Sequence, residues 1–159
     1  MLPSLYQALA SLPLKHTFLF IGFTEEEKGL VGSRFYVRHL SPEKAGRIRA
    51  MVNLECLGLS TPKVWSDHAG PKLLSALFEV AKILPVPLQG IDLESVGRDD
   101  AESFRARKIS TITIQSLTQD TIHIMHTRRD TFAAINMTYY DESYRLVAAY
   151  LAYLDSVLP

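Results

Sequence analysis

The sequence has little of what marks several large classes of protein. Its one cysteine, Cys56, excludes an intrachain disulfide. Its 17 lysines and arginines balance its 17 aspartates and glutamates, and no stretch concentrates basic residues, which disfavours nucleic acid and anionic membranes as partners. The apolar run near residue 20 is too short to span a bilayer. Residues 1–4 lack the charged-then-apolar order of a secretion signal, so the compartment stays open.

What the chain does have is enough apolar sequence for one globular domain. Its 159 residues are 47% hydrophobic, and no linker or repeat divides them, so residues 1–159 are expected to form a single domain. Strand-like and helix-like segments alternate, which predicts an α/β layered fold. Helices are expected at residues 3–12, 30–40 and 42–49, after Gly70, and near the end of the chain; strands are expected at 16–23, 50–57, 109–115 and, in a short form, 61–65.

The strand expected at residues 16–23 has a continuous apolar core, Phe18-Leu19-Phe20-Ile21. Continuous rather than alternating apolar residues indicate burial on both faces. We therefore expect this strand to have neighbouring strands on both sides.

Carboxylates follow the first two expected strands. Glu25, Glu26 and Glu27 come after the first, and Glu55 ends the second. Repelling carboxylates at the end of a core strand are costly unless a cation neutralises them. In open α/β sheets this end is also where ligands bind. A metal ion explains the pattern, and His126, in the polar region after the third strand, supplies an imidazole suited to zinc.

The glutamate doublet can divide two tasks between its members. Adjacent residues on an extended backbone point in different directions, so one of Glu26 and Glu27 can face a metal while the other faces its water. A hydrolytic zinc site needs this division into ligand and general base. Asp99, Asp100 and Asp130 are candidates to orient the imidazole.

Four segments together resemble the M28 family of zinc exopeptidases, which includes aminopeptidases and has glutaminyl cyclases as relatives. Residues 23–33 (Phe-Thr-Glu-Glu-Glu-Lys-Gly-Leu-Val-Gly-Ser) resemble its Phe-x-x-x-Glu-Glu-x-Gly-Leu-x-Gly-Ser motif. Residues 52–58 resemble its Asn-Leu-Asp/Glu-x-x-Gly segment, and residues 126–131 its His-Thr-x-x-Asp motif. Residues 100–104 are similar to its Ser-Asp-His-x-x-Phe segment, with Asp99 and Ala101 flanking the aspartate.

The resemblance implies roles for individual residues. Glu26 is implied as the general base, Glu27 and His126 as ligands of one zinc ion, and Glu55 as a ligand of a second. The implied substrates are peptides, from whose ends residues are removed.

The resemblance also implies the surroundings of this site. Asp100 and Asp130 are implied as supporting residues. The implied fold is a three-layer α/β/α sandwich around a mixed, mainly parallel sheet.

The chain also departs from the family pattern. The family has an early His-x-Asp segment and a bridging aspartate before the doublet, whereas the first aspartate here is Asp67 and the only earlier histidine is His16. The remaining ligands fall short of the usual three or four. We therefore expect a partial domain in which the strand at residues 17–22 exposes an apolar edge, through which the chain forms a homo-oligomer.

Simpler interpretations remain for each site residue. The glutamates could be a solvated helix start, Glu55 a loop carboxylate and His126 a structural histidine. Cys56 could be a thiol ligand, although a small buried apolar residue is the favoured interpretation. Two other functions also remain: a non-catalytic peptidase-fold domain that self-associates, and a glutaminyl-cyclase-like transferase.

Overall fold

A four-stranded mixed sheet forms the centre of the molecule. The computed structural model describes residues 1–92 and 98–159. The strands β1 (Met51–Leu54), β2 (Lys63–Trp65), β3 (Gln89–Ile91) and β4 (Thr111–Gln115) are arranged in the order β1-β4-β2-β3. β1 is parallel to β4 and β2 to β3, while β2 and β4 are antiparallel. The predicted mixed, mainly parallel sheet is confirmed.

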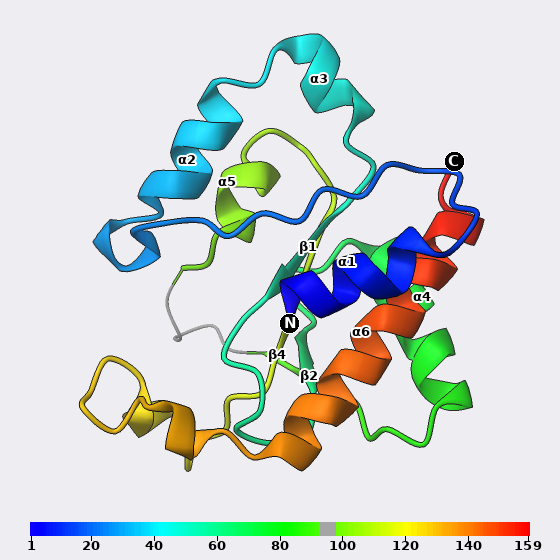
Figure 1. The fold of residues 1–159 in the computed structure, drawn as a ribbon. Coiled ribbons are helices and arrows are strands. Elements are labelled where there is room, and N and C mark those ends of the chain that lie inside the picture. Colours follow the sequence, from blue (N-terminus) through cyan, green and yellow to red (C-terminus); the bar gives the residue numbers. More distant parts are fainter. Residues whose placement is uncertain (93–97) are drawn as a thin grey trace.

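Three helices cover one face of this sheet. They are α1 (Leu2–Ala10), α4 (Pro71–Ile83) and α6 (Met137–Val157), which lie together in Figure 1. Each helix presents apolar side chains at helical spacing, and these meet the strands in the main core. Fully buried members of this core include Leu5, Val64, Leu73, Leu77, Ile112, Ile114, Leu146, Val147 and Tyr150.

A smaller set of helices covers the opposite face. α2 (Val31–Arg38) packs against α5 (Ala101–Arg105), which contacts β1 and β4, and α3 (Pro42–Arg47) follows α2 (Figure 1). The buried centre of this layer is a cluster of Val37, Phe104 and Ile109. Helices on both faces make the three-layer α/β/α arrangement that was predicted.

The strand expected at residues 16–23 is wrong. None of the hydrogen bonds found in the described part of the chain involves the backbone of residues 17–22, and β1 pairs with β4 alone. Leu19 is 69% exposed and Ile21 37% exposed, whereas Phe18 and Phe20 pack on the main core. The segment is thus covered on one face only, by the main core, and pairs with no strand among the described residues.

The start of this extended segment is fixed by Asp155 near the end of α6. The carboxylate of Asp155 accepts hydrogen bonds from the backbone N–H of Lys15 at 2.9–3.0 Å and of His16 at 2.8 Å. The His16 ring nitrogen Nδ1 lies 3.1 Å from the same carboxylate. Residues distant in sequence are therefore held together by one buried acid.

No helix in residues 1–92 and 98–159 is long and apolar enough to cross a membrane.

Candidate functional site

A cavity of about 540 Å³ lies at the carboxyl ends of β1 and β4. It is the place where the sequence predicted a ligand site. Five of the six predicted site residues line this cavity: Glu26, Glu27, Glu55, Asp100 and His126. The structure therefore brings together residues from four separate segments.

The closest approach between predicted metal ligands joins Glu27 and His126. Nδ1 of His126 lies 2.8 Å from Oε2 of Glu27. Glu27 belongs to a single 3₁₀ turn, η1 (Glu26–Lys28), and His126 follows another, η2 (Ile122–Ile124). Both side chains are more than half exposed, so they remain accessible to an ion or a substrate.

Glu26 lies deeper than its neighbour. Burial raises the pKa of Glu26 above its usual value, and the negative charges of Glu27 and Asp100 raise it further. The positive charge that His126 can carry acts in the opposite direction. The doublet thus places one glutamate at the surface of the cavity and one partly inside it.

Glu55 comes directly after β1. Burial raises its pKa to about 7, and the hydrogen bond that Asn53 Nδ2 donates to Glu55 Oε1 at 2.8 Å partly offsets this effect. The nearby charges of Asp99 and Glu26 add to the rise. Asn53 is a hydrogen-bond partner of Glu55 that the sequence did not single out, although it lies within the same short motif.

The two neighbouring aspartates have different surroundings. The buried carboxylate of Asp99 accepts hydrogen bonds from Thr113, from Arg105 at 3.2 Å and from Asn53 at 3.4 Å. Asp100 lines the cavity, burial raises its pKa, and its Oδ1 has no hydrogen-bond partner among the described residues. Asp99 therefore holds together the side chains beneath the cavity, whereas Asp100 faces the cavity.

Two further residues, Asp130 and Cys56, differ from what the sequence predicted. The side chain of Asp130 is exposed, and no hydrogen bond joins it to His126 among the residues that the structure describes. Cys56 is exposed, so its interpretation as a small buried apolar residue is wrong. Because β1 ends at Leu54, Cys56 belongs to the turn that follows, where it lines the cavity.

Two buried donors of the cavity wall were not predicted. Trp65 Nε1 and Gln115 Nε2 belong to cavity-lining residues and have no partner among the described residues. Both side chains are less than one tenth exposed. Buried donors without partners are rare, and each costs free energy.

Strained backbone is concentrated around this site. Glu25, Leu30, Cys56 and His126 have φ angles of 53°, 60°, 45° and 59°, in the left-handed region that non-glycine residues seldom adopt. Such conformations persist where surrounding contacts impose them, and they are frequent at ligand sites. The strain falls on the loops that carry the predicted ligands.

The side chains present match zinc in kind but not in number. Carboxylate oxygen and imidazole nitrogen are normal zinc ligands, and Glu27 and His126 offer one of each at short range. Within residues 1–92 and 98–159, however, no group of three or more His, Cys, Asp or Glu is placed to hold a metal ion. A catalytic zinc ion usually has three protein ligands. The described residues therefore supply ligand types that suit zinc, but not a complete set of them.

Comparison with known families decides the assignment. The model of "Peptidase family M28" matches residues 1–151. The chain belongs to peptidase family M28. Among curated proteins, a probable leucine aminopeptidase 2 of Aspergillus oryzae is 29% identical over 109 residues, which is 62% of this chain and 22% of that protein.

Solved structures of two aminopeptidases and a glutaminyl cyclase share the fold of this chain. BSAP, a zinc aminopeptidase from Bacillus subtilis, gives a TM-score of 0.84 at 23% identity over 97% of this chain and 39% of its own. The LapA aminopeptidase of Legionella pneumophila gives 0.77 at 25% identity over 91% and 42%. A glutaminyl cyclase from an Acidobacteriales bacterium gives 0.67 at 18% identity over 80% and 46%. This M28 chain thus spans less than half the length of each.

Proposed function

We propose that this chain acts in the hydrolysis of terminal peptide bonds, as a zinc-dependent exopeptidase of the aminopeptidase type. The observation that carries the proposal is the approach of His126 Nδ1 to Glu27 Oε2 at 2.8 Å, in a cavity that Glu26 also lines. The family assignment supports peptide substrates, and relatives named as aminopeptidases support the terminal position of the bond.

Glu27 and His126 would hold one zinc ion, and Glu55 would ligate a second. Bound zinc polarises a carbonyl group and lowers the pKa of a water molecule. Each of the two zinc ions would need further ligands beyond those in the described residues. Asp100 and Asp130 remain supporting residues in this proposal.

Glu26 is the proposed general base. It lies next to Glu27 on η1, partly buried in the cavity wall, where it can take a proton from the attacking water and pass it to the leaving amine. The unpartnered N–H groups of Trp65 and Gln115 would donate hydrogen bonds to peptide carbonyl oxygens of the substrate, which would fix the substrate relative to Glu26.

An assay of the purified chain with zinc and leucine arylamide tests the proposal. We expect hydrolysis that the Glu26→Gln variant reduces by about 10²–10⁴-fold, because this variant removes the proton acceptor. Glu25→Gln is the matched control, since Glu25 is exposed and pairs with Lys28. Absence of hydrolysis by the zinc-treated chain at high protein concentration would overturn the proposed activity.

A second candidate function is self-association without catalysis. It is favoured by the extended segment at residues 17–22, whose backbone takes part in no hydrogen bond found in the described part of the chain and whose outer face exposes Leu19 and Ile21. Unpaired extended backbone with apolar side chains is a template for pairing with another chain.

A glutaminyl-cyclase-like activity is tested in parallel, by cyclisation of a peptide with N-terminal glutamine.

A further inference from the structure

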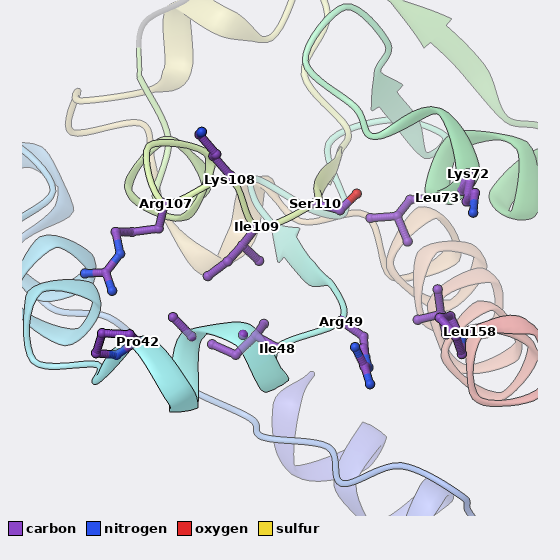
Figure 2. Close-up of a pocket in the computed structure, with 13 residues that line it drawn as sticks. Pro42, Ile48, Arg49, Lys72, Leu73, Arg107, Lys108, Ile109, Ser110 and Leu158 are labelled. Carbon is purple, nitrogen blue, oxygen red and sulfur yellow. The ribbon is translucent and has the colours of Figure 1, made fainter.

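A second cavity lies at the other end of the same two strands. It has a volume of about 580 Å³ and is bordered by Arg49, just before β1, and by Ile109 and Ser110, just before β4 (Figure 2). The candidate active site lies at the carboxyl ends of these strands, so the sheet separates the two cavities. A volume of about 300–1,000 Å³ is typical of sites for small molecules.

The rim of this cavity is strongly basic. It carries Arg49, Lys72, Arg107 and Lys108, and no Asp or Glu is among its described lining residues, although the chain as a whole has no net charge. None of the four takes part in an ion pair found in the described part of the chain. Their mutual repulsion is therefore relieved only by solvent and by backbone carbonyl groups.

Two contacts at the rim affect how much of its positive charge is free to bind a ligand. Arg107 donates hydrogen bonds to the backbone carbonyls of Val37 at 3.2 Å and Leu40 at 3.4 Å, so its guanidinium is held in place. Pro159 also borders the cavity, and its main-chain oxygen lies 3.3 Å from Nε2 of His16. A main-chain carboxylate at this position would thus already have a partner.

The middle of the cavity is apolar. Figure 2 shows Ile48 and Ile109 between Arg107 and Lys108 on one side and Lys72 and Leu158 on the other. Ile109 is only 6% exposed, so its side chain is packed in place at the bottom of the cavity. Apolar floor and cationic rim together suit a molecule with an apolar body and an acidic group.

The backbone at Lys108 has a conformation that lysine seldom adopts. Lys108 has a φ of 60° at the end of α5, where its N–H donates to Arg105 O and the N–H of Ile109 donates to Phe104 O. This is the Schellman pattern, whose left-handed position is usually glycine. A lysine there costs stability, and its side chain lines the cavity and takes part in no ion pair found among the described residues.

We propose that this cavity binds a small organic anion, a carboxylate or phosphate group joined to an apolar chain or ring. The acidic group contacts Arg49, Lys72 and Lys108, and the apolar part covers Ile48 and Ile109. Arg107, held by its carbonyl partners, adds a fixed positive charge.

Fluorescence titration with 8-anilinonaphthalene-1-sulfonate, together with ¹H–¹⁵N NMR to locate the contact, tests this site. Saturable binding with shifts at Ile48, Leu73 and Ile109 is expected, and octanoate should displace the probe at least about tenfold better than octan-1-ol, which lacks the charge. Equal displacement by the two compounds, or shifts confined to other parts of the molecule, would overturn the proposal.

Two sets of variants separate binding from folding. Arg49→Glu/Lys72→Glu should weaken probe binding at least about tenfold, whereas Arg38→Glu/Lys82→Glu, with the same change in net charge at exposed sites elsewhere, should not. Lys108→Gly should also weaken binding without lowering the thermal midpoint, because glycine suits the left-handed position. Unchanged binding in Arg49→Glu/Lys72→Glu and in Lys108→Gly would show that the basic rim plays no part.

Discussion

Gly32 packs directly on the backbone of Thr24. Its N–H donates to Thr24 O at 3.0 Å, and a Cβ atom at position 32 would lie 2.7 Å from both the N and the O of Thr24. Contacts below 3.0 Å to backbone atoms are not tolerated without movement. The first turn of α2 is thus clamped to the residue that precedes the three glutamates, which fixes the path of the loop between them.

Gly32→Ala should therefore destabilise the fold and displace the glutamate doublet. We expect a loss of about 1–3 kcal/mol in the free energy of unfolding, because the added methyl group forces the backbone apart. Urea denaturation measures this loss. Gly22→Ala is the control, since no atom lies within 4 Å of a Cβ there, and equal losses in both variants would contradict the clamp.

His126→Ala should abolish most of the zinc affinity of the chain. Loss of a residue that merely supports a ligand costs about 10–100-fold in affinity, so loss of a ligand should cost at least about 100-fold. Competition with a chromophoric chelator measures the affinity. The matched control is His123→Ala, an exposed histidine on η2 that does not line the cavity. Equal zinc affinity in the two variants would remove His126 from the proposed site.

Asp155→Asn should destabilise the protein in a pH-dependent way. Backbone hydrogen bonds from Lys15 and His16 hold the pKa of Asp155 below its usual value. A lowered folded-state pKa adds stability above the unfolded value of about 3.9, and this stability is lost as the pH falls through the folded pKa. The difference between wild type and variant should thus be large at neutral pH and shrink in acid.

Urea denaturation across this pH range measures the difference. Asp141→Asn serves as control, because Asp141 is an exposed residue of the same helix. A wild-type advantage that stays constant down to strongly acidic pH would show that the carboxylate of Asp155 is not the source.

Leu19→Lys/Ile21→Lys should reduce any self-association of the chain. Charged side chains on an exposed extended segment oppose pairing with another strand. We expect size-exclusion chromatography with light scattering to show a concentration-dependent dimer in the wild type and a monomer in the variant. Ile83→Lys/Phe132→Lys changes two even more exposed apolar residues elsewhere and should leave the dimer intact. A monomeric wild type at all concentrations would exclude this mode of association.

Periodic apolar patterns predicted most of the fold. The stripe of Leu73 and Leu77 indicated α4, and the β-branched run before Gln115 indicated β4; both are confirmed. The short β3 (Gln89–Ile91) was missed, because Gln-Gly-Ile has no strand pattern of its own and pairs with β2 only through the tertiary fold. The strand at residues 16–23 was wrong for the opposite reason, since apolar composition cannot reveal a missing neighbour.

Only those residues of the candidate site that belong to a recognisable sequence motif could be predicted. The motifs were enough to expect Glu27 near His126, and the structure places them in contact. The hydrogen bond from Asn53 to Glu55 and the unpartnered donors of Trp65 and Gln115 depend on three-dimensional packing that no local pattern encodes. The left-handed turn at Cys56 likewise reversed the expectation of burial.

The Asp155 contact and the Gly32 contact lie on either side of the same extended stretch, at His16 and at Thr24. Residues 17–22 are therefore tethered at both ends, while their backbone N–H and C=O groups make no hydrogen bond found in the described part of the chain. Much of the conformational entropy that an acceptor strand normally loses on pairing has already been lost in folding. An incoming strand would meet a preorganised partner and would need to order little beyond itself.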